Sequence, residues 1–285
     1  MRLNISILSL SEMLTAITSI PRNERFLDLG GNELNLASPK DLSLAISKIP
    51  DGIISLDLSN NDFGHQHYKS LTKVLQSIPE TVDELHLHMN KLKLHKNGGL
   101  VQVLHSLHAH LSALNLSHND LGLCATLELI NALKALKSPL TSMQLSWNKL
   151  GDKTTDELSE IFKALPTTLT TLDLSYNGLD KLSLFELSSV LKNIPETVTC
   201  LDLSGHGFET KTDMKKTEFL ESLPINVKRL KLSRDITIEL ESEKLKEPKA
   251  RVHSFFSQFS DSPTDPKQDQ SLGFAATEPF AGLCR

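Results

Sequence analysis

The chain has 285 residues, of which 39% are hydrophobic, so it is long enough to bury one large core or one continuous stacked core. A formal net charge of −5 is mild for this length and supplies no basic face for phosphates, which argues against a nucleic-acid partner. No run of about 18 apolar residues occurs, so the sequence predicts no membrane-spanning helix.

The cysteines are few and scattered. Cys124, Cys200 and Cys284 form no CxxC pair. An odd, sparse set of this kind is not typical of a disulfide framework or of a zinc site. It favours reduced thiols, as in a cytosolic protein.

The first predicted element is an N-terminal half-unit within residues 1–26. Polar residues interrupt its apolar ones and no small-residue cleavage site follows, so we expect folded structure and not a signal peptide. Its apolar residues follow the i, i+3, i+4, i+7 spacing of one helix face: Met13, Ala16, Ile17 and Ile20. We expect this helix to cap the elements that follow.

Eight similar segments come next, each starting 29 residues after the previous one, without insertion or deletion. They read LDLGGNEL (27–34), LDLSNNDF (56–63), LHLHMNKL (85–92), LNLSHNDL (114–121), MQLSWNKL (143–150), LDLSYNGL (172–179), LDLSGHGF (201–208) and LKLSRDIT (230–237). Their period-two leucines predict short strands with one buried face. A fixed period of this length indicates a solenoid of repeated units.

The second half of each unit predicts a helix. One unit places Leu71, Val74, Leu75 and Ile78 on a single helix face, and the same columns recur in the others. A proline follows in most units and ends the helix, because it lacks an N–H and restrains the residue before it. These prolines are Pro21, Pro50, Pro79, Pro166, Pro195 and Pro224.

Strands about 4.8 Å apart and helices about 10 Å wide stack without mismatch only if the array curves. We therefore expect strands on the concave face and helices on the convex face. An asparagine recurs beside the buried leucines: Asn32, Asn61, Asn90, Asn119, Asn148 and Asn177. Such a column predicts an Asn ladder bonded to the backbone of adjacent turns, with an amide-lined ligand channel as the alternative. His206, Asp235 and Thr237 break the pattern and indicate a degenerate C-terminal end.

The LxxLxLxxNxL pattern with a helical second half resembles the ribonuclease-inhibitor-like class of leucine-rich repeats over residues 1–237. The style of the repeats is also similar to leucine-rich-repeat effectors that bacteria deliver through type IV secretion. The resemblance implies an α/β leucine-rich-repeat solenoid with eight units and an N-terminal half-unit cap. It implies binding of another macromolecule more than catalysis, because fold alone specifies function weakly.

Two surfaces are candidates for a protein partner. The first consists of strand residues expected to face the concavity, with a plain solvated sheet face as the alternative: Asp57, His86, His88, Gln144, Asp173 and Asp202. The second is the column immediately before the asparagines, where four adjacent units carry Met89, His118, Trp147 and Tyr176. Exposed aromatic residues are enriched at binding hot spots, so we interpret this column as a binding ridge. The alternative is that these side chains fill gaps between loops.

Catalytic and metal-binding motifs are not evident. His86 and His88 share one strand face, as two metal ligands do, but no Cys or carboxylate column completes a site, so we expect no metal and no cofactor. Cys200 has only His206 nearby in sequence as a base, and that side chain is expected to point inward. A GTPase-regulating role requires an exposed arginine, and Arg22, Arg25, Arg229 and Arg234 lie near the two ends without a recognisable motif.

The end of the chain divides into two predicted segments. Residues 238–259 place Val252, Phe255, Phe256 and Phe259 on one stripe, which predicts a helix that covers the last repeat. Residues 260–285 are rich in Ser, Pro, Asp and Gln, which predicts disorder. Their ending resembles a C-terminal type IV secretion signal, with an ordinary disordered tail as the alternative.

These observations predict a monomeric, non-enzymatic interaction module. The expected function is that of a bacterial effector that binds a host protein in the host cytoplasm. The alternative is a regulator or inhibitor of an enzyme, like the ribonuclease inhibitor or a GTPase regulator.

Overall fold

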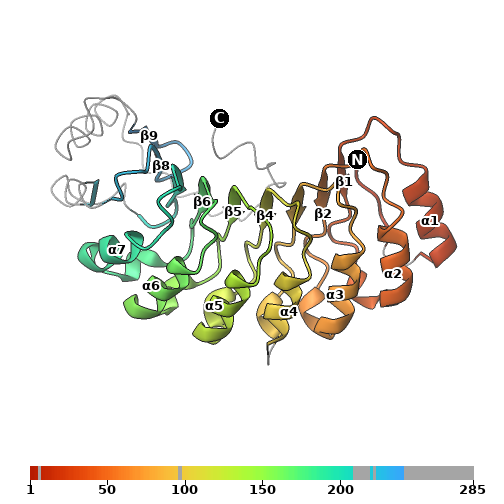
Figure 1. The fold of residues 1–285 in the computed structure, drawn as a ribbon, viewed down its shortest axis with the longest axis horizontal. Coiled ribbons are helices and arrows are strands. Elements are labelled where there is room, and N and C mark those ends of the chain that lie inside the picture. Colours follow the sequence, from red (N-terminus) through yellow and green to blue (C-terminus); the bar gives the residue numbers. More distant parts are fainter. Residues whose placement is uncertain (6–7, 96–97, 208–218, 221–222, 241–285) are drawn as a thin grey trace, which may run out of the picture.

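The chain folds into a row of similar units. In Figure 1 they follow one another from right to left, with helices along the outer arc and strands on the opposite side. The computed structural model describes residues 1–5, 8–95, 98–207, 219–220 and 223–240. Nine short strands form one sheet in chain order. They are β1 (Phe26–Asp28), β2 (Ser55–Asp57), β3 (Glu84–His86), β4 (Ala113–Asn115), β5 (Ser142–Gln144), β6 (Thr171–Asp173), β7 (Cys200–Asp202), β8 (Arg229–Lys231) and β9 (Thr237–Glu239).

Strands β1 to β8 are parallel and stay in the register that the sequence repeat predicts. Leu27 pairs with Leu56, Leu56 with Leu85, and so on to Leu230. Every one of these central residues is fully buried, since it faces the core between sheet and helices. The leucine-rich-repeat solenoid predicted from the sequence is thereby confirmed.

The helices are short and end before the prolines that follow them, so Ile20 and Ile78 of the last apolar column lie just beyond their helices. They are α1 (Leu10–Thr18), α2 (Pro39–Ile46), α3 (Tyr68–Gln76), α4 (Gly99–His105), α5 (Thr126–Lys134), α6 (Thr155–Lys163) and α7 (Leu184–Leu191). Ser9, Thr154 and Ser183 begin three of them with capping boxes that involve a glutamate three residues later. The apolar columns of these helices, such as Leu71, Val74 and Leu75, are buried against the sheet.

Each of the first six strands leads through a tight turn into a short 3-10 helix. These are η1 (Leu34–Leu36), η2 (Phe63–His65), η3 (Leu92–Leu94), η4 (Leu121–Leu123), η5 (Leu150–Asp152) and η6 (Leu179–Lys181). The residues on either side of the turn asparagine are left-handed, with φ between 51° and 59° at all ten non-glycine positions. This conformation costs about 1 kcal/mol or more for an L-residue, so the surrounding hydrogen bonds must hold it.

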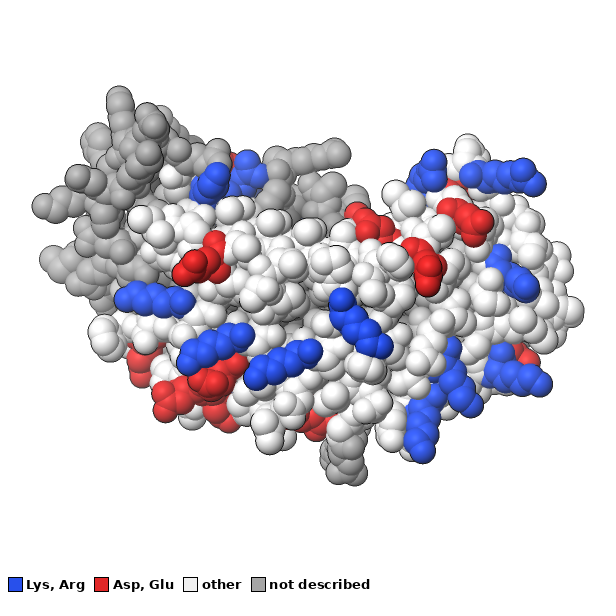
Figure 2. Space-filling model, in the orientation of Figure 1, with Lys and Arg blue, Asp and Glu red and all other residues white. Residues whose placement is uncertain are grey.

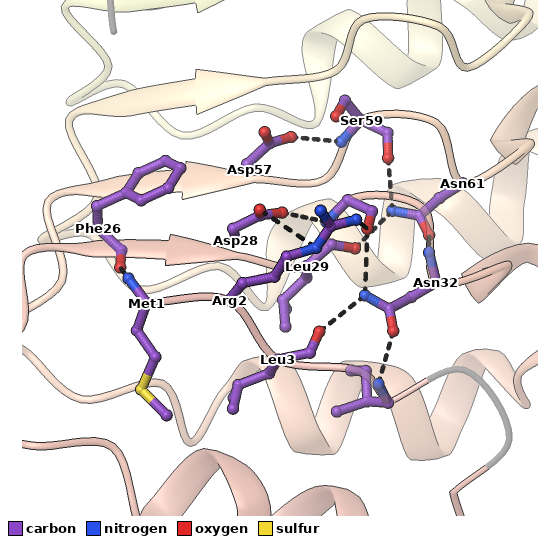
Figure 3. A network of polar contacts seen from close by, with 12 residues as sticks. Met1, Arg2, Leu3, Phe26, Asp28, Leu29, Asn32, Asp57, Ser59 and Asn61 are labelled. Carbon is purple, nitrogen blue, oxygen red and sulfur yellow. Dashed lines mark hydrogen bonds and ion pairs between the residues drawn. The ribbon is translucent and has the colours of Figure 1, made fainter. Parts of the chain in front are cut away.

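The asparagine column forms the predicted ladder, which Figure 3 shows at its N-terminal end. The Asn61 side chain accepts from the backbone N–H of Asn32 at 2.9 Å and donates to the carbonyls of Leu29 and Leu58 at 3.0 Å. The same bonds recur at Asn90, Asn119, Asn148 and Asn177. These amides are fully used by the backbone, which favours the ladder over a ligand channel.

The N-terminal cap contains an extended segment as well as helix α1. Arg2 forms a parallel bridge to Asp28, and Leu3 donates its N–H to the Asp28 carbonyl at 2.9 Å. Asn32 bonds this segment as a ladder residue would, since it accepts from the Ile5 N–H and donates to the Leu3 carbonyl (Figure 3). The first five residues therefore cover the edge of β1 and satisfy its backbone groups.

The C-terminal end differs from the prediction. Residues 238 and 239 were expected to begin a helix, but Thr237–Glu239 form β9, which pairs antiparallel with β8. A strand at this place satisfies the backbone groups that the edge of β8 would otherwise leave open, and a helix start would not. Residues 241–259 of the predicted helix and the predicted disordered tail at 260–285 lie outside the described residues.

Among the described residues, no helix has the length and apolar character needed to cross a bilayer.

Candidate functional site

The strand residues expected to face the concavity are mostly buried. Asp57, His86 and His88 are 3%, 2% and 8% exposed. Asp173 and Asp202 are 8% and 3% exposed, and Gln144 is half-buried. A side chain with so little accessible area contributes little new contact to an arriving partner.

Several of these side chains have a structural role, because they accept hydrogen bonds from the backbone of the turn after their strand. The carboxylates of Asp57, Asp173 and Asp202 each accept from the backbone N–H two residues later, at 2.8 Å. Asp28 and Asn115 make the same bond at 2.8 and 2.9 Å. This is an Asx turn, in which the side chain takes the place of a missing backbone acceptor. The polar column therefore shapes the turn that follows each strand.

The two histidines of β3 lie close together. The rings of His86 and His88 have centroids 6.2 Å apart in an edge-on arrangement. Burial lowers the pKa of His86, against the opposing charge of Asp57, and lowers the pKa of His88 to about 4. No group of three or more His, Cys, Asp or Glu residues suited to a metal ion occurs in the described part of the chain.

Near the C-terminal end of the sheet, two buried carboxylates are neighbours. Burial, together with the charge of Asp202, raises the pKa of Asp173 to about 6. Lys231 pairs with Asp202 at 3.1 Å and so offsets part of this repulsion. Paired carboxylates serve acid–base catalysis at some sites, but both of these already accept a backbone N–H, which is a sufficient account of their position.

The predicted ridge is present and is organised by ring stacking. We define the aromatic ridge as His118, Trp147 and Tyr176. The His118 and Trp147 rings stack at 5.0 Å and 14°, and the Trp147 and Tyr176 rings stack at 4.5 Å and 8°. Trp147 and Tyr176 remain 41% and 44% exposed. The alternative of gap-filling side chains accounts for the stacking but not for this exposure.

The backbone of the turns explains why the ridge projects outward. His118, Trp147 and Tyr176 are left-handed with φ of 53°, 56° and 52°, and each precedes a buried ladder asparagine. Each of their backbone N–H groups donates to a serine carbonyl of the next unit, as Trp147 does to Ser175 at 3.1 Å. Since the asparagine must point inward, the residue before it points away from the core. The 29-residue repeat then places these side chains in register.

A shallow groove of about 330 Å³ runs along the ridge. Its lining consists of the aromatic ridge together with Asn60, Met89, Lys91, Asp120 and Lys149. Asp120 binds Lys149 at 2.8 Å and Lys93 at 2.9 Å. Although burial alone would raise the pKa of Asp120, these two lysines hold it below its usual value. We call this surface the ridge groove. It brings together the predicted residues Met89, His118, Trp147 and Tyr176, while the strand residues are not part of it.

The remaining candidates for chemistry have other roles. Cys124 is buried and free, and burial raises its pKa to about 11, so its thiol is unreactive near neutral pH. Cys200 is buried at the start of strand β7. Arg25 donates to the Gly52 carbonyl at 3.1 Å, and Arg229 pairs with Glu239 at 2.6 Å. These two arginines are engaged in the fold, which disfavours them as catalytic fingers.

Charges of both signs are interspersed on the face of the molecule drawn in Figure 2. That face therefore lacks the continuous basic surface by which a protein tracks a phosphate backbone.

The stacked repeats and the asparagine ladder define a leucine-rich-repeat protein, and comparison with known proteins agrees. A family model described as "Leucine Rich repeat" matches residues 108–123 and 166–188. The chain belongs to the leucine-rich-repeat family. None of the curated proteins matches it.

Among solved structures, the leucine-rich repeat-containing protein LegL7 from Legionella pneumophila is similar to this chain. The two are 32% identical with a TM-score of 0.76, and the match covers 82% of this chain and 73% of LegL7. The tropomodulin C-terminal domain of Caenorhabditis elegans matches at 10% identity and a TM-score of 0.37, over 55% of this chain and 92% of that domain. The second likeness is too weak to carry an argument.

Proposed function

We propose that this leucine-rich-repeat protein binds another protein and acts as a bacterial effector on a host protein. The observation that carries the proposal is the aromatic ridge, because exposed Trp and Tyr side chains bury much area at little entropic cost. The similarity to a protein of the bacterium Legionella pneumophila supports the bacterial origin. The buried strand columns shift the proposed contact surface from the concave sheet to the ridge groove.

Removal of the ridge side chains tests the binding surface. We expect Trp147→Ala with Tyr176→Ala to abolish partner capture from host-cell lysate. The loss of two ring stacks, at about 1 kcal/mol each, should reduce the free energy of unfolding by about 2 kcal/mol. Capture is measured by affinity purification and stability by urea unfolding. The matched control is Leu127→Ala with Phe185→Ala, which removes two exposed apolar side chains from helices α5 and α7. Undiminished capture by the ridge variant, or equal loss in the control, would contradict the proposal.

The effector part of the proposal has its own test. Residues 260–285 are expected to carry the delivery signal, because their composition resembles the C-terminal signals of type IV substrates. A chain truncated before residue 260 should no longer enter host cells from the bacterium, as measured with a fused translocation reporter. Its thermal unfolding should match that of the full chain. Undisturbed delivery of the truncated chain would refute the signal.

A further inference from the structure

The aromatic ridge offers a partner ring edges and not ring faces. Trp147 is covered on one face by His118 and on the other by Tyr176. The far face of Tyr176 lies against Gly205, where an added Cβ would come within 2.3 Å of the ring. What remains accessible is therefore the rim of the stack. The rim of an aromatic ring carries partial positive charge, and its face carries the negative charge.

The polar atoms of the ridge reinforce this positive character. The indole nitrogen of Trp147 is only a donor, and the Tyr176 hydroxyl is both donor and acceptor. Within the described residues, neither group has a hydrogen-bond partner. An incoming group rich in acceptor oxygens can therefore replace water at both donors without breaking a hydrogen bond within the protein.

The lysines beside the ridge complete the pattern. Lys91 and Lys149 line the ridge groove, and their side chains are 51% and 52% exposed. Among the described residues that line the groove, Asp120 is the one carboxylate, and both of its oxygens are engaged, one by Lys149 and the other by Lys93. Lys91 pairs in turn with Asp62 at 2.7 Å. Lys91, Lys93 and Lys149 therefore face two carboxylates, and the groove keeps one positive charge in excess on a chain whose net charge is −5.

We propose that the ridge groove binds an acidic, extended peptide segment of the protein partner, whose Asp and Glu carboxylates meet Lys91, Lys149 and the rim of the aromatic ridge. The inference rests on the proposed function and names the chemistry of the partner. Single-stranded nucleic acid also combines negative charge with affinity for aromatic residues, but it requires open ring faces on which bases stack. The ring faces here are already occupied by one another.

The chain supplies its own reporter for a test, because Trp147 is its only tryptophan. The intact protein is titrated with a short glutamate-rich peptide, with the glutamine peptide of the same length, and with oligothymidylate, while Trp147 fluorescence is followed. We expect saturable binding of the glutamate peptide, at least tenfold tighter than the other two probes. Binding should weaken as salt is raised, since exposed charges are screened over about 10 Å at 0.1 M salt.

Charge-reversal variants then test whether the glutamate peptide binds at the ridge groove. Lys91→Glu with Lys149→Glu should weaken binding of the glutamate peptide at least tenfold. Glutamate is compatible with these left-handed positions, because Glu33 occupies the equivalent place in the first unit with a φ of 51°. Lys73→Glu with Lys192→Glu changes the net charge equally, at exposed positions within α3 and at the C-terminal cap of α7, and should leave affinity unchanged. Urea unfolding checks that both variants fold.

Three results would overturn the inference. They are tighter binding of oligothymidylate than of the glutamate peptide, equal affinity of the groove variant and its control, and absence of glutamate-peptide binding. If the glutamate peptide does not bind while Trp147→Ala with Tyr176→Ala still abolishes capture of a protein partner, the proposed function stands and the acidic chemistry is wrong. If both tests are negative, the ridge is not the binding surface.

Discussion

Replacement of Asn119 by alanine is expected to lower the free energy of unfolding by about 4 kcal/mol, since each unsatisfied buried polar group costs about 1–3 kcal/mol. The Asn119 side chain accepts from the backbone N–H groups of Asn90 and Leu92 at 3.0 and 3.2 Å. Alanine leaves both donors without a partner in a fully buried place. The carbonyls that Asn119 also binds are less affected, because Leu87 still receives the amide of Asn90 and Leu116 that of Asn148.

Because Asn119 lies in the middle of the solenoid, its replacement should also change the shape of the unfolding curve. In a solenoid each unit contacts only its neighbours, so a weak interface in the middle tends to separate the array into two cooperative parts. Urea unfolding followed by circular dichroism should show a lower midpoint and a broader transition. Asn131→Ala, on the exposed face of helix α5, is the control and should change stability by less than about 0.5 kcal/mol. Similar curves for both variants would mean that the ladder contributes little.

Repetition made most of this fold predictable. Asn61, Asn90 and Asn119 recur beside buried leucines at one spacing, and a buried amide in a repeated place must bond to the neighbouring unit. The same regularity identified the column of Trp147 and Tyr176 as one edge of the molecule. Stacking itself follows from the register of the strands, so the ring contacts are a consequence of the repeat.

Features that do not follow the 29-residue period could not be predicted from the repeat. The pairing of Arg2 with Asp28 spans 26 residues and not 29, so periodicity does not reveal it. Strand β9 is antiparallel and local, and nothing in the parallel pattern predicts it. The role of Asp57 and Asp173 carried an available signal, because Asp or Asn followed two residues later by Ser or Gly is typical of an Asx turn. The alternation of polar and apolar residues along a strand predicts instead that each polar side chain faces solvent.

Acid is expected to destabilise the fold through two buried histidines. Burial, together with His86 and against the charges of Asp57 and Asp28, lowers the pKa of His88 to about 4. Burial and the neighbouring His67 lower the pKa of His95 to about 4. In the unfolded chain these rings take up protons near pH 6.5, whereas in the folded chain they stay neutral down to about pH 4. Their contribution to stability is therefore complete above pH 6.5 and is lost as the pH falls towards 4.

The expected loss for the two histidines together is roughly 4 kcal/mol between pH 7 and pH 5, by linkage. Asp173 acts in the opposite direction, because its pKa is raised to about 6 and its protonation favours the fold as the pH falls. By the same linkage it offsets only about 1 kcal/mol of that loss. The wild-type chain should therefore unfold at a lower urea concentration at pH 5 than at pH 7.

The double variant His88→Ser with His95→Gln isolates the contribution of these two histidines to the pH dependence of stability from that of every other titrating group. The repeat itself supplies both replacements, since Ser59 and Gln66 occupy the equivalent places one unit earlier. In urea unfolding at both pH values, the difference in stability between pH 7 and pH 5 should shrink by about 4 kcal/mol in this variant, whatever its stability at pH 7. His65→Gln, at an exposed histidine, should keep the wild-type difference. An unchanged difference in the double variant would show that these rings already bind protons in the folded chain, and that the interior beside β3 admits charge.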